Sequence, residues 1–248
     1  MSGKIYVSNR ELVVPGQLIA EGDFKVTTPL YINTVGRKHY STVIGLANID
    51  EEKGTLGIIP LEGFYYPSQD DLVIGVIKNV GITSWEVDIR APFTAILYAA
   101  DLLGRPINPA KEDLSQYLDV GDMILAKVEV FDRTRDPILT TKGKGLGKIT
   151  KGAVIEISPV KVPRVIGKKG SMHQTLESET GCKITVAKNG RVLIECPNKA
   201  LEEIVILAIR KIEREAHIPG LTDRIKEFIL KEKVRRGLVG GETKTPEG

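Results

Sequence analysis

The sequence predicts a multidomain chain with an all-β N-terminal domain over residues 1–66, a small β-barrel over 67–150, and an α+β domain with a C-terminal helix over 151–248. Short apolar runs broken by Gly or Pro fill the first segment, and alternating apolar residues joined by turns fill the second. Helical periodicity begins only in the third segment. With 248 residues, 42% of them hydrophobic, the chain is long enough to bury a large core.

The N-terminal segment is expected to form short strands separated by turns. Its stretches ELVVPGQLIAEG and GTLGIIPLEGFYYP place Gly or Pro every few residues and show no helical spacing. The segment offers little polar chemistry of its own. We therefore expect it to dock on a partner or to form a structural lid.

The second segment predicts four or five strands, which is enough for a small closed barrel. DDLVIGVIKNVG has the apolar positions Leu72, Ile74 and Val76, while SWEVDI alternates around Trp85, which is expected in the core. GDMILAKVEVFD and PILTTKG supply the later strands. The stretch GKGLGKIT at 143–150 is interpreted as a flexible basic linker to the third segment.

The third segment predicts the order strand, short helix, Gly-Lys-Lys-Gly, helix, hairpin and helix. VPRVI forms the short helix that ends at Gly167, and a second helix runs from Gly170 to about Thr180. Asn-Gly at 189–190 is a strong hairpin signal. Asn198 is a candidate N-cap for a long helix, and a final amphipathic helix covers about 221–236.

Positive charge is concentrated next to that Gly-Lys-Lys-Gly corner. Residues 1–150 hold 16 Lys and Arg against 19 Asp and Glu, whereas residues 151–248 hold 19 against 13. Between positions 140 and 170 there are eight basic residues and one acid, Glu156. Such a potential attracts polyanions, phosphate backbones above all, although a solvated face is the alternative interpretation.

No metal, cofactor or catalytic site is predicted, so we expect a protein that is not an enzyme. The three histidines lie too far apart for a metal pair on one helix, and no CxxC motif is present. Cys182 and Cys196 could pair across neighbouring strands, but a cytoplasmic location favours small buried thiols. That location is expected because no apolar run approaches the ~20 residues of a bilayer span and the N-terminus lacks a signal-peptide centre.

The order of elements around the glycine-lysine corner resembles the type I KH domain, whose GxxG loop clamps about four nucleotides. Glycines let the backbone approach phosphates closely, and the second helix directs free N–H groups and its positive dipole end at them. The RNA-binding residues expected here are the loop (Gly167, Lys168, Lys169, Gly170), an apolar floor (Val165, Ile166, Ile184) and basic rims (Arg164, Lys188, Arg191).

The barrel resembles the ribosomal-S-one-type OB fold, an RNA-binding module. The likeness is carried by Gly75, by AILYAADL at 95–102 and by FDRTRDPILTTK at 131–142. The aromatic pair of that family is replaced by Thr83 and Glu86, whereas the ring of Tyr98 is kept. The RNA contacts expected from the barrel are therefore Tyr98 and the loop cations Arg90, Arg105, Arg133, Arg135 and Lys142.

The domain order as a whole resembles the RNA-binding cap subunit of the exosome, the ribosomal RNA processing protein four family, in its archaeal branch. PGQLIAEG at 15–22 and VPRVIGKKGSM at 162–172 are its most specific marks. The resemblance implies a non-catalytic subunit, three copies of which sit on a hexameric ring of phosphorolytic exoribonuclease subunits beside other cap subunits. It further implies that these copies bind single-stranded RNA, prefer A-rich tails and thread the 3′ end into the channel.

Two other functions stay open at this point. A transcription or translation factor that binds single-stranded RNA can also place an OB barrel before KH modules, although it normally has two KH units of the other topology. A nuclease acting alone is the third hypothesis, and it predicts that purified protein shortens labelled RNA.

Overall fold

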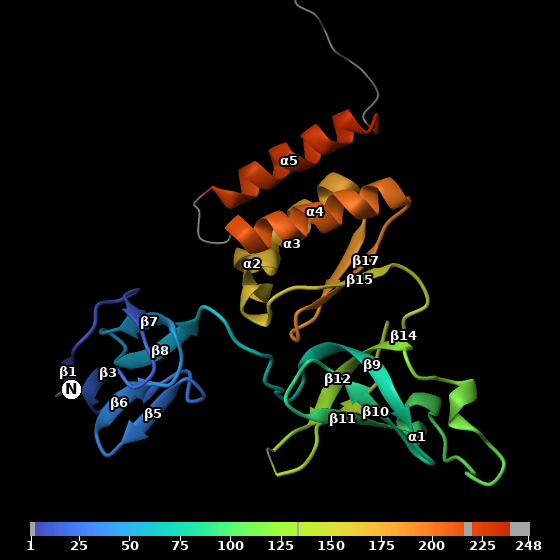
Figure 1. The fold of residues 1–248 in the computed structure, drawn as a ribbon, viewed down its shortest axis with the longest axis horizontal. Coiled ribbons are helices and arrows are strands. Elements are labelled where there is room, and N and C mark those ends of the chain that lie inside the picture. Colours follow the sequence, from blue (N-terminus) through green and yellow to red (C-terminus); the bar gives the residue numbers. More distant parts are fainter. Residues whose placement is uncertain (1–2, 133, 216–219, 239–248) are drawn as a thin grey trace, which may run out of the picture. The chain divides into compact units, whose positions relative to one another are not determined.

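The computed structural model describes residues 3–132, 134–215 and 220–238. It divides into two compact units, Met1–Gly63 and Phe64–Gly248. The barrel and the α+β domain, predicted as separate domains, both belong to the second unit (Figure 1). The predicted fold class, a β domain followed by a barrel and an α+β domain, is confirmed.

The N-terminal unit consists of two four-stranded sheets, with the strand orders β1-β3-β6-β5 and β2-β7-β8-β4. Val13, Ile19 and Leu56 are fully buried in its core. His39 is a core histidine whose polar atoms are satisfied, because its ring nitrogens lie 2.9 Å from Thr34 Oγ1 and 3.0 Å from the Gly22 carbonyl. The strands are β1 (Gly3–Ile5), β2 (Leu12–Val13), β3 (Leu18–Gly22), β4 (Lys25–Val26), β5 (Ile32–Val35), β6 (Lys38–Ser41), β7 (Gly45–Asp50) and β8 (Thr55–Pro60).

The barrel has five strands in the order β13-β11-β10-β9-β12, and it closes because β12 also pairs with β13. Trp85 is fully buried inside it, as expected, and its indole N–H donates to the Leu118 carbonyl at 2.9 Å. The elements are β9 (Leu72–Val80), β10 (Ser84–Asp88), β11 (Thr94–Tyr98), α1 (Ala99–Leu103), η1 (Leu114–Gln116), β12 (Met123–Val130), β13 (Ile138–Thr140) and β14 (Gly147–Lys148).

Apolar residues lie on both faces of β9. Val73 and Ile77 face the barrel interior, whereas Leu72 and Ile74, on the alternate side, face outward. Ile74 is nevertheless buried, because the KH domain covers that outer face. The expectation that 143–150 is a flexible linker is wrong, since β14 pairs with β12, and Leu146 and Ile149 pack in the same apolar cluster.

The third segment has the predicted type I KH order. Its sheet runs β15-β17-β16 and is antiparallel. Asn198 is the N-cap of the long helix, since its Oδ1 accepts from the Leu201 amide at 2.9 Å. Ile225 and Ile229 of the last helix are buried in the KH core. The elements are β15 (Ala153–Glu156), η2 (Pro159–Lys161), α2 (Val162–Ile166), η3 (Lys168–Gly170), α3 (Ser171–Thr180), β16 (Lys183–Val186), β17 (Arg191–Glu195), α4 (Lys199–Glu215) and α5 (Leu221–Arg235).

Cys182 and Cys196 form a disulfide, so the expectation of two reduced thiols is wrong. Lys183 and Glu195 are register partners at the open end of the β16–β17 hairpin, and the two cysteines lie one pair further out. Their Cα atoms are 4.3 Å apart. The hairpin register places the two cysteines opposite each other, as the sequence had allowed. The expected cytoplasmic location had favoured reduced thiols instead.

None of the helices in the described ranges is long and apolar enough to span a bilayer. Within the same ranges no group of three or more His, Cys, Asp and Glu side chains could hold a metal ion.

Candidate nucleic-acid interface

The Gly-Lys-Lys-Gly loop is a tight corner that only its two glycines allow. Gly167 has a φ of 77°, and a Cβ placed there would lie 2.6 Å from the Met172 amide nitrogen. Gly170 has a φ of 80° but opens onto empty space. Lys169 between them is also left-handed, with a φ of 54°. The corner thus brings bare backbone to the start of α3, where no side chain caps the N-terminus.

The cations around this loop lack carboxylate partners. Arg164, Lys168, Lys169 and Lys188 are exposed, as predicted for the loop and its rims, and Lys161 is half-buried. No acid occurs between Glu156 and Glu177 in the sequence. Among the described residues none of these five cations forms an ion pair, and each is therefore available to an anion.

Of these five cations, Lys188 lines a hollow beside the loop, and the other four lie within two residues of a lining residue in the sequence. A pocket of about 220 Å³ opens beside the loop. Its walls are mainly apolar and come from α2, the turn before it and the hairpin tip, with Gly167 at its edge. The lining residues are Pro159, Val162, Pro163, Ile166, Gly167 and Lys188. A flat base can lie on such a surface while the cations hold the phosphates on either side.

Three residues expected at this groove lie elsewhere. Val165 is fully buried and Ile184 is 3% exposed, so both belong to the KH core and only Ile166 of the predicted floor reaches the pocket. Arg191, expected at an exposed rim, is 4% exposed. Its guanidinium donates hydrogen bonds to Asp88, to Glu156 and to backbone carbonyls of the barrel, so no nitrogen is left for RNA. The idea that Arg191 lies free at the rim is therefore wrong.

Arg90 also differs from its expected position on a free loop. Its Nη1 donates to the Ile157 carbonyl at 2.9 Å, and its Nε lies 3.6 Å from Glu156. Both partners belong to the KH domain. Arg90 therefore joins the barrel to the KH domain.

Three further cations predicted on the barrel are each engaged by a carboxylate. Arg105 makes a bidentate pair with Glu112 at 2.9 and 2.6 Å, and this lowers the pKa of Glu112 to about 2. Arg135 lies 2.8 Å from Asp132, and Lys142 lies 3.3 Å from Asp101. Arg133 falls outside the described residues. These pairs are exposed or partly exposed, so an RNA phosphate would have to compete with each of them.

Hydrogen bonds explain why Asp101 can hold Lys142. Burial of Asp101 acts to raise its pKa, but the hydrogen bonds from Thr140 and Thr141 outweigh it and the pKa is lowered. The carboxylate therefore stays charged, with the Thr141 amide at 2.6 Å.

Tyr98 is the one predicted stacking ring of the barrel, and its side chain is accessible. It is 46% exposed at the end of β11. Its register partner on β10 is Ser84, and the neighbouring outward position on β10 is the exposed Glu86. A carboxylate beside the ring makes this face less favourable for a polyanion than the KH groove.

Sequence reasoning missed Pro159, Lys161 and the barrel residue Lys127. Pro159 and Lys161 precede the short helix, so their spacing from the GxxG loop was available as a signal. Lys127 is exposed on β12, and no described carboxylate pairs with it. Nothing in the sequence places it near the KH domain, because that proximity depends on how the hairpin packs against the barrel.

Comparison with protein families gives two matches. Residues 10–62 match the model of the exosome RNA binding protein RRP4 N-terminal domain, and residues 152–214 match the KH domain. The first match covers most of the N-terminal unit. The second covers the loop, the pocket and the hairpin.

Several archaeal proteins are similar to this chain over nearly its whole length. The exosome complex component Rrp4 of Saccharolobus solfataricus is 54% identical over 245 residues, which are 98% of this chain and 97% of that protein. Its counterpart in Sulfurisphaera tokodaii is 50% identical, over 98% of this chain and 95% of that protein. The Aeropyrum pernix counterpart is 48% identical, over 94% and 98%.

A solved structure gives the same result. The crystal structure of an exosome complex RNA-binding protein is 54% identical to this chain, with a TM-score of 0.68, and the match covers 70% of this chain and 99% of that one.

Proposed function

The chain belongs to the Rrp4 family of exosome components, a family of non-catalytic RNA-binding subunits, and on this basis we propose that its loop at 167–170 clamps single-stranded RNA. The observation that carries the proposal is an apolar pocket lined by Gly167 and Lys188, with further cations on the same short stretch of chain. None of these cations forms an ion pair among the described residues: Lys161, Arg164, Lys168, Lys169 and Lys188. Cations that lack partners among the described residues, beside a surface that fits a base, are what a sugar–phosphate chain requires.

The proposed contact divides the work between backbone and side chains. The corner at Gly170 leaves room for one phosphate to approach the backbone, at the positive dipole end of α3, where no side chain caps the helix. Lys168 and Lys169 neutralise the charge, and the base lies against Ile166 and Pro163 in the pocket. Neither contact supplies a group that would cleave the RNA, so we expect the strand to be bound without being cleaved.

We extend the proposal to assembly. Three copies of the chain form a cap with other cap subunits on a hexameric phosphorolytic RNase ring in the cytoplasm, and they direct RNA 3′ ends into its channel with a preference for A-rich tails. This finer proposal is supported by the kinship to Rrp4 proteins, which are named as exosome components.

An apolar sheet face on the N-terminal unit supports docking on the ring. Leu12, Leu46 and Ile59 are register partners on three adjacent strands. Leu12 is 54% exposed. Further exposed apolar residues lie two positions along, just past the ends of these strands, where the Leu61 amide still donates to the Ile44 carbonyl. The apolar sheet face comprises Leu12, Val14, Ile44, Leu46, Ile59 and Leu61.

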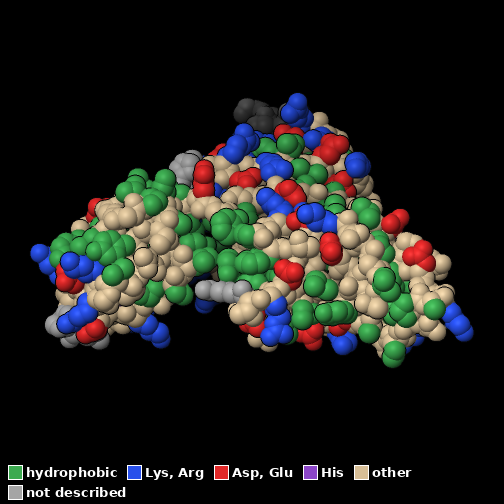
Figure 2. All heavy atoms as spheres, turned by 60° about the horizontal axis from the view of Figure 1, so that its bottom comes forward, with side chains coloured by type: hydrophobic (Ala, Val, Ile, Leu, Met, Phe, Trp, Pro, Cys, Tyr) green, Lys and Arg blue, Asp and Glu red, His purple; other side chains and the backbone are tan. Residues whose placement is uncertain are grey.

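Contiguous exposed apolar surface of this kind marks a protein interface. In the view of Figure 2, hydrophobic side chains reach the surface over much of the N-terminal unit. A free subunit would leave this face in water, whereas a subunit docked on a ring would bury it.

RNA binding is tested with the double variant Lys168→Asp, Lys169→Asp. We expect a sharp fall in affinity for a labelled single-stranded RNA in a gel shift, with unchanged circular dichroism because both lysines are exposed. The slope of log affinity against log salt should fall by about 0.7 for each phosphate that no longer meets a cation. The matched control, Lys111→Asp with Lys226→Asp, makes the same charge change away from the loop.

If the loop variant binds like the wild type, the clamp is excluded and the RNA contact lies on the barrel. The same labelled RNA, incubated with the purified protein alone in phosphate and magnesium, should stay intact. Shortening that follows the protein through purification would contradict the non-catalytic role. Native mass spectrometry with ring subunits tests the cap, with three copies of this chain per hexameric ring as the expected result.

A further inference from the structure

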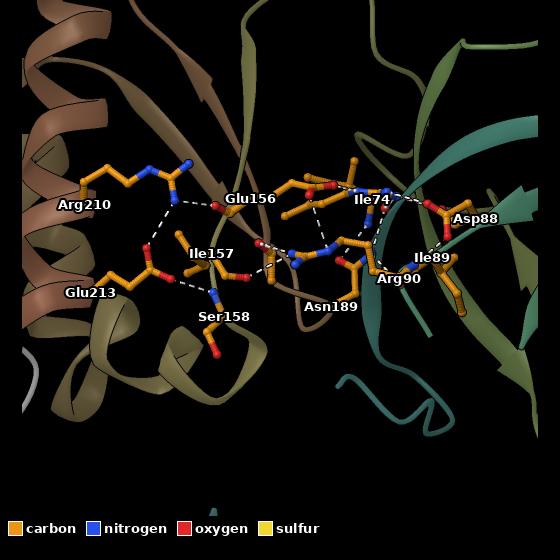
Figure 3. Close-up of polar contacts among 12 residues, drawn as sticks. Ile74, Asp88, Ile89, Arg90, Glu156, Ile157, Ser158, Asn189, Arg210 and Glu213 are labelled. Carbon is orange, nitrogen blue, oxygen red and sulfur yellow. Dashed lines mark hydrogen bonds and ion pairs between the residues drawn. The ribbon is translucent and has the colours of Figure 1, made fainter. Parts of the chain in front are cut away.

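The tip of the β16–β17 hairpin packs against the outer face of the barrel. Asn189 is fully buried, and its Nδ2 donates to the Ile74 carbonyl at 2.8 Å and to the Ile89 carbonyl at 3.0 Å (Figure 3). Its Oδ1 accepts from the Ile74 amide at 3.4 Å. The single amide thus binds two strands of the barrel, β9 and the end of β10, from the KH side.

Arg191 makes the second set of contacts between the hairpin and the barrel. The contacts of Asn189 and Arg191 are together called the joint. Arg191 Nη1 donates to the carbonyls of Asp88 at 2.7 Å and Ile74 at 3.1 Å, and its Nη2 pairs with Asp88 Oδ2 at 2.5 Å. Its Nε donates to Glu156 at 3.0 Å. A buried guanidinium with every nitrogen engaged in a fixed fork tolerates little movement of its partners. Asn189 and Arg191 together therefore hold the KH domain in one orientation on the barrel.

The joint ties directly to the proposed RNA groove. Lys188, which lines the pocket, is next to Asn189, and its amide donates to the Leu72 carbonyl of β9 at 2.9 Å. Next to this hydrogen bond, barrel and hairpin residues pack in one apolar cluster, which consists of Ile74, Leu125, Ala187 and Leu193. The position of Lys188 relative to the barrel is thus set by the joint.

Lys127 is the barrel cation at the edge of this contact. It is the register partner of Leu72, so the two side chains lie on the same outer face as the buried pair Leu125 and Ile74. It is exposed, unlike that pair, and no carboxylate among the described residues pairs with it. A strand leaving the pocket past Lys188 would meet Lys127 as the next cation.

We propose that Asn189 and Arg191 are positioning residues that align the KH groove with the barrel, so that one RNA strand held at 167–170 continues past Lys188 to a phosphate contact at Lys127. This inference rests on the proposed function and adds to it a path and a joint. Two sites on one rigid body share a strand at high effective concentration, and a loosened joint lowers that concentration without changing either site.

The test compares two RNAs on the whole chain. One of about four nucleotides occupies the KH loop alone, and one of about 12 nucleotides is long enough for the loop and the barrel together. Fluorescence anisotropy gives both affinities for the wild type, Lys127→Ala, Asn189→Ala and Asp88→Asn. Lys111→Ala is the matched control, an exposed lysine elsewhere on the barrel.

We expect Lys127→Ala to weaken only the longer RNA, by about three- to tenfold, and to lower its salt slope by about 0.7. Asn189→Ala and Asp88→Asn should weaken the longer RNA and leave the short one unchanged. Lys111→Ala should change neither. Because Lys127 is exposed, its variant keeps the test valid even if a joint variant fails to fold.

If Lys127→Ala binds the longer RNA with wild-type affinity, the proposed path of the strand from Lys188 to Lys127 is wrong. An equal fall in affinity for both RNAs in the joint variants overturns the positioning role, because the joint then only supports the loop's own fold. Failure of the proposed function is distinct, since in that case the variant Lys168→Asp, Lys169→Asp would bind the short RNA as well as the wild type does.

Discussion

At the level of single residues, the two glycines of the loop have different physical roles. Gly167 combines a φ of 77° with close packing, since a Cβ would lie 2.8 Å from Met172 Cβ. Gly170 has a similar φ of 80° but meets no atom within 4 Å. Gly167 is therefore needed for packing and conformation, and Gly170 for conformation and for open access to the backbone.

This difference predicts unequal effects of alanine. Gly170→Ala should lower the free energy of unfolding by about 1 kcal/mol, the conformational cost of a left-handed alanine. Gly167→Ala should cost at least about 1 kcal/mol more, because the corner must also shift away from α3. Urea unfolding of the two variants measures the difference, and equal destabilisation would contradict the packing role of Gly167.

Arg191 shows where residue-level reasoning from sequence ends. Lys188 and Arg191 both flank the Asn-Gly turn and look alike as basic hairpin residues. Lys188 is exposed, whereas Arg191 is 4% exposed and fully paired. Alternation along the strand cannot separate the two roles, because Arg191 is buried by another domain and not by its own sheet.

At the level of elements, the disulfide closes the open end of the β16–β17 hairpin, opposite the turn that packs against the barrel. Cys182 directly follows the C-cap of α3, Gly181, and Cys196 directly follows β17. The bridge therefore also fixes the end of α3 to the sheet. The N-terminus of the same helix, α3, follows the Gly-Lys-Lys-Gly loop, so the bridge also supports the element on which the loop is built.

Loss of this bridge should destabilise the KH domain. Linking residues 14 apart stabilises by up to about 3 kcal/mol in the chain-entropy model. We expect the double variant Cys182→Ser, Cys196→Ser to lower the unfolding free energy by this order, and a reductant to do the same to the wild type. The double variant should not respond to reductant. A wild type that unfolds identically with and without reductant would show that the thiols are not paired in solution.

The elements themselves follow well from local sequence. The short helix at Val162–Ile166, the helix at Ser171–Thr180 and the Asn-Gly hairpin all lie where glycine placement predicts them. The misread stretch at 143–150 has no such local signal for strand. It becomes β14 because β12 offers an edge to pair with and Ile149 has an apolar cluster to join.

At the level of the whole molecule, the second unit depends on a charged contact between its barrel and KH parts. Burial of Asp88 acts to raise its pKa, but hydrogen bonds from Arg191 and from the Arg90 amide outweigh it, so the pKa is lowered in the folded protein. The contribution of Asp88 to stability is therefore complete above its unfolded pKa of about 3.9 and is lost as the pH falls below that value.

Thermal unfolding from about pH 7 down to about pH 3 tests this linkage. Asp88→Asn should be less stable than the wild type at neutral pH, and the difference should shrink below about pH 4, where the wild-type carboxyl also becomes neutral. A difference that stays constant down to about pH 3 would mean that Asp88 does not act through its charge.

The N-terminal unit gives a prediction about assembly. Leu12→Asp places a charge on the apolar sheet face, at its edge strand β2, and should reduce incorporation into a complex with ring subunits, measured by native mass spectrometry. Val35→Asp is the control, since Val35 is 60% exposed but lies on β5 in the other sheet. RNA affinity of the isolated chain should not change in either variant. Equal incorporation of both variants would exclude this face as the docking surface.

Local sequence was sufficient to define the fold class, the type I KH order and the position of the glycine-lysine corner. Each of these depends on spacing, turn chemistry and periodicity within about twenty residues, which local physics controls. It also identified Lys168 and Lys169 as exposed loop cations, because a left-handed corner between two glycines projects its side chains outward.

Which cations are available to RNA, and which are structural, depends instead on packing between distant segments. Arg90 and Arg191 are bound within the contact between the barrel and the KH domain, while Lys127 is exposed at its edge. The reason is that a charged side chain is free or paired according to what lies within about 4 Å of it, and those neighbours come from residues about a hundred positions away in the chain.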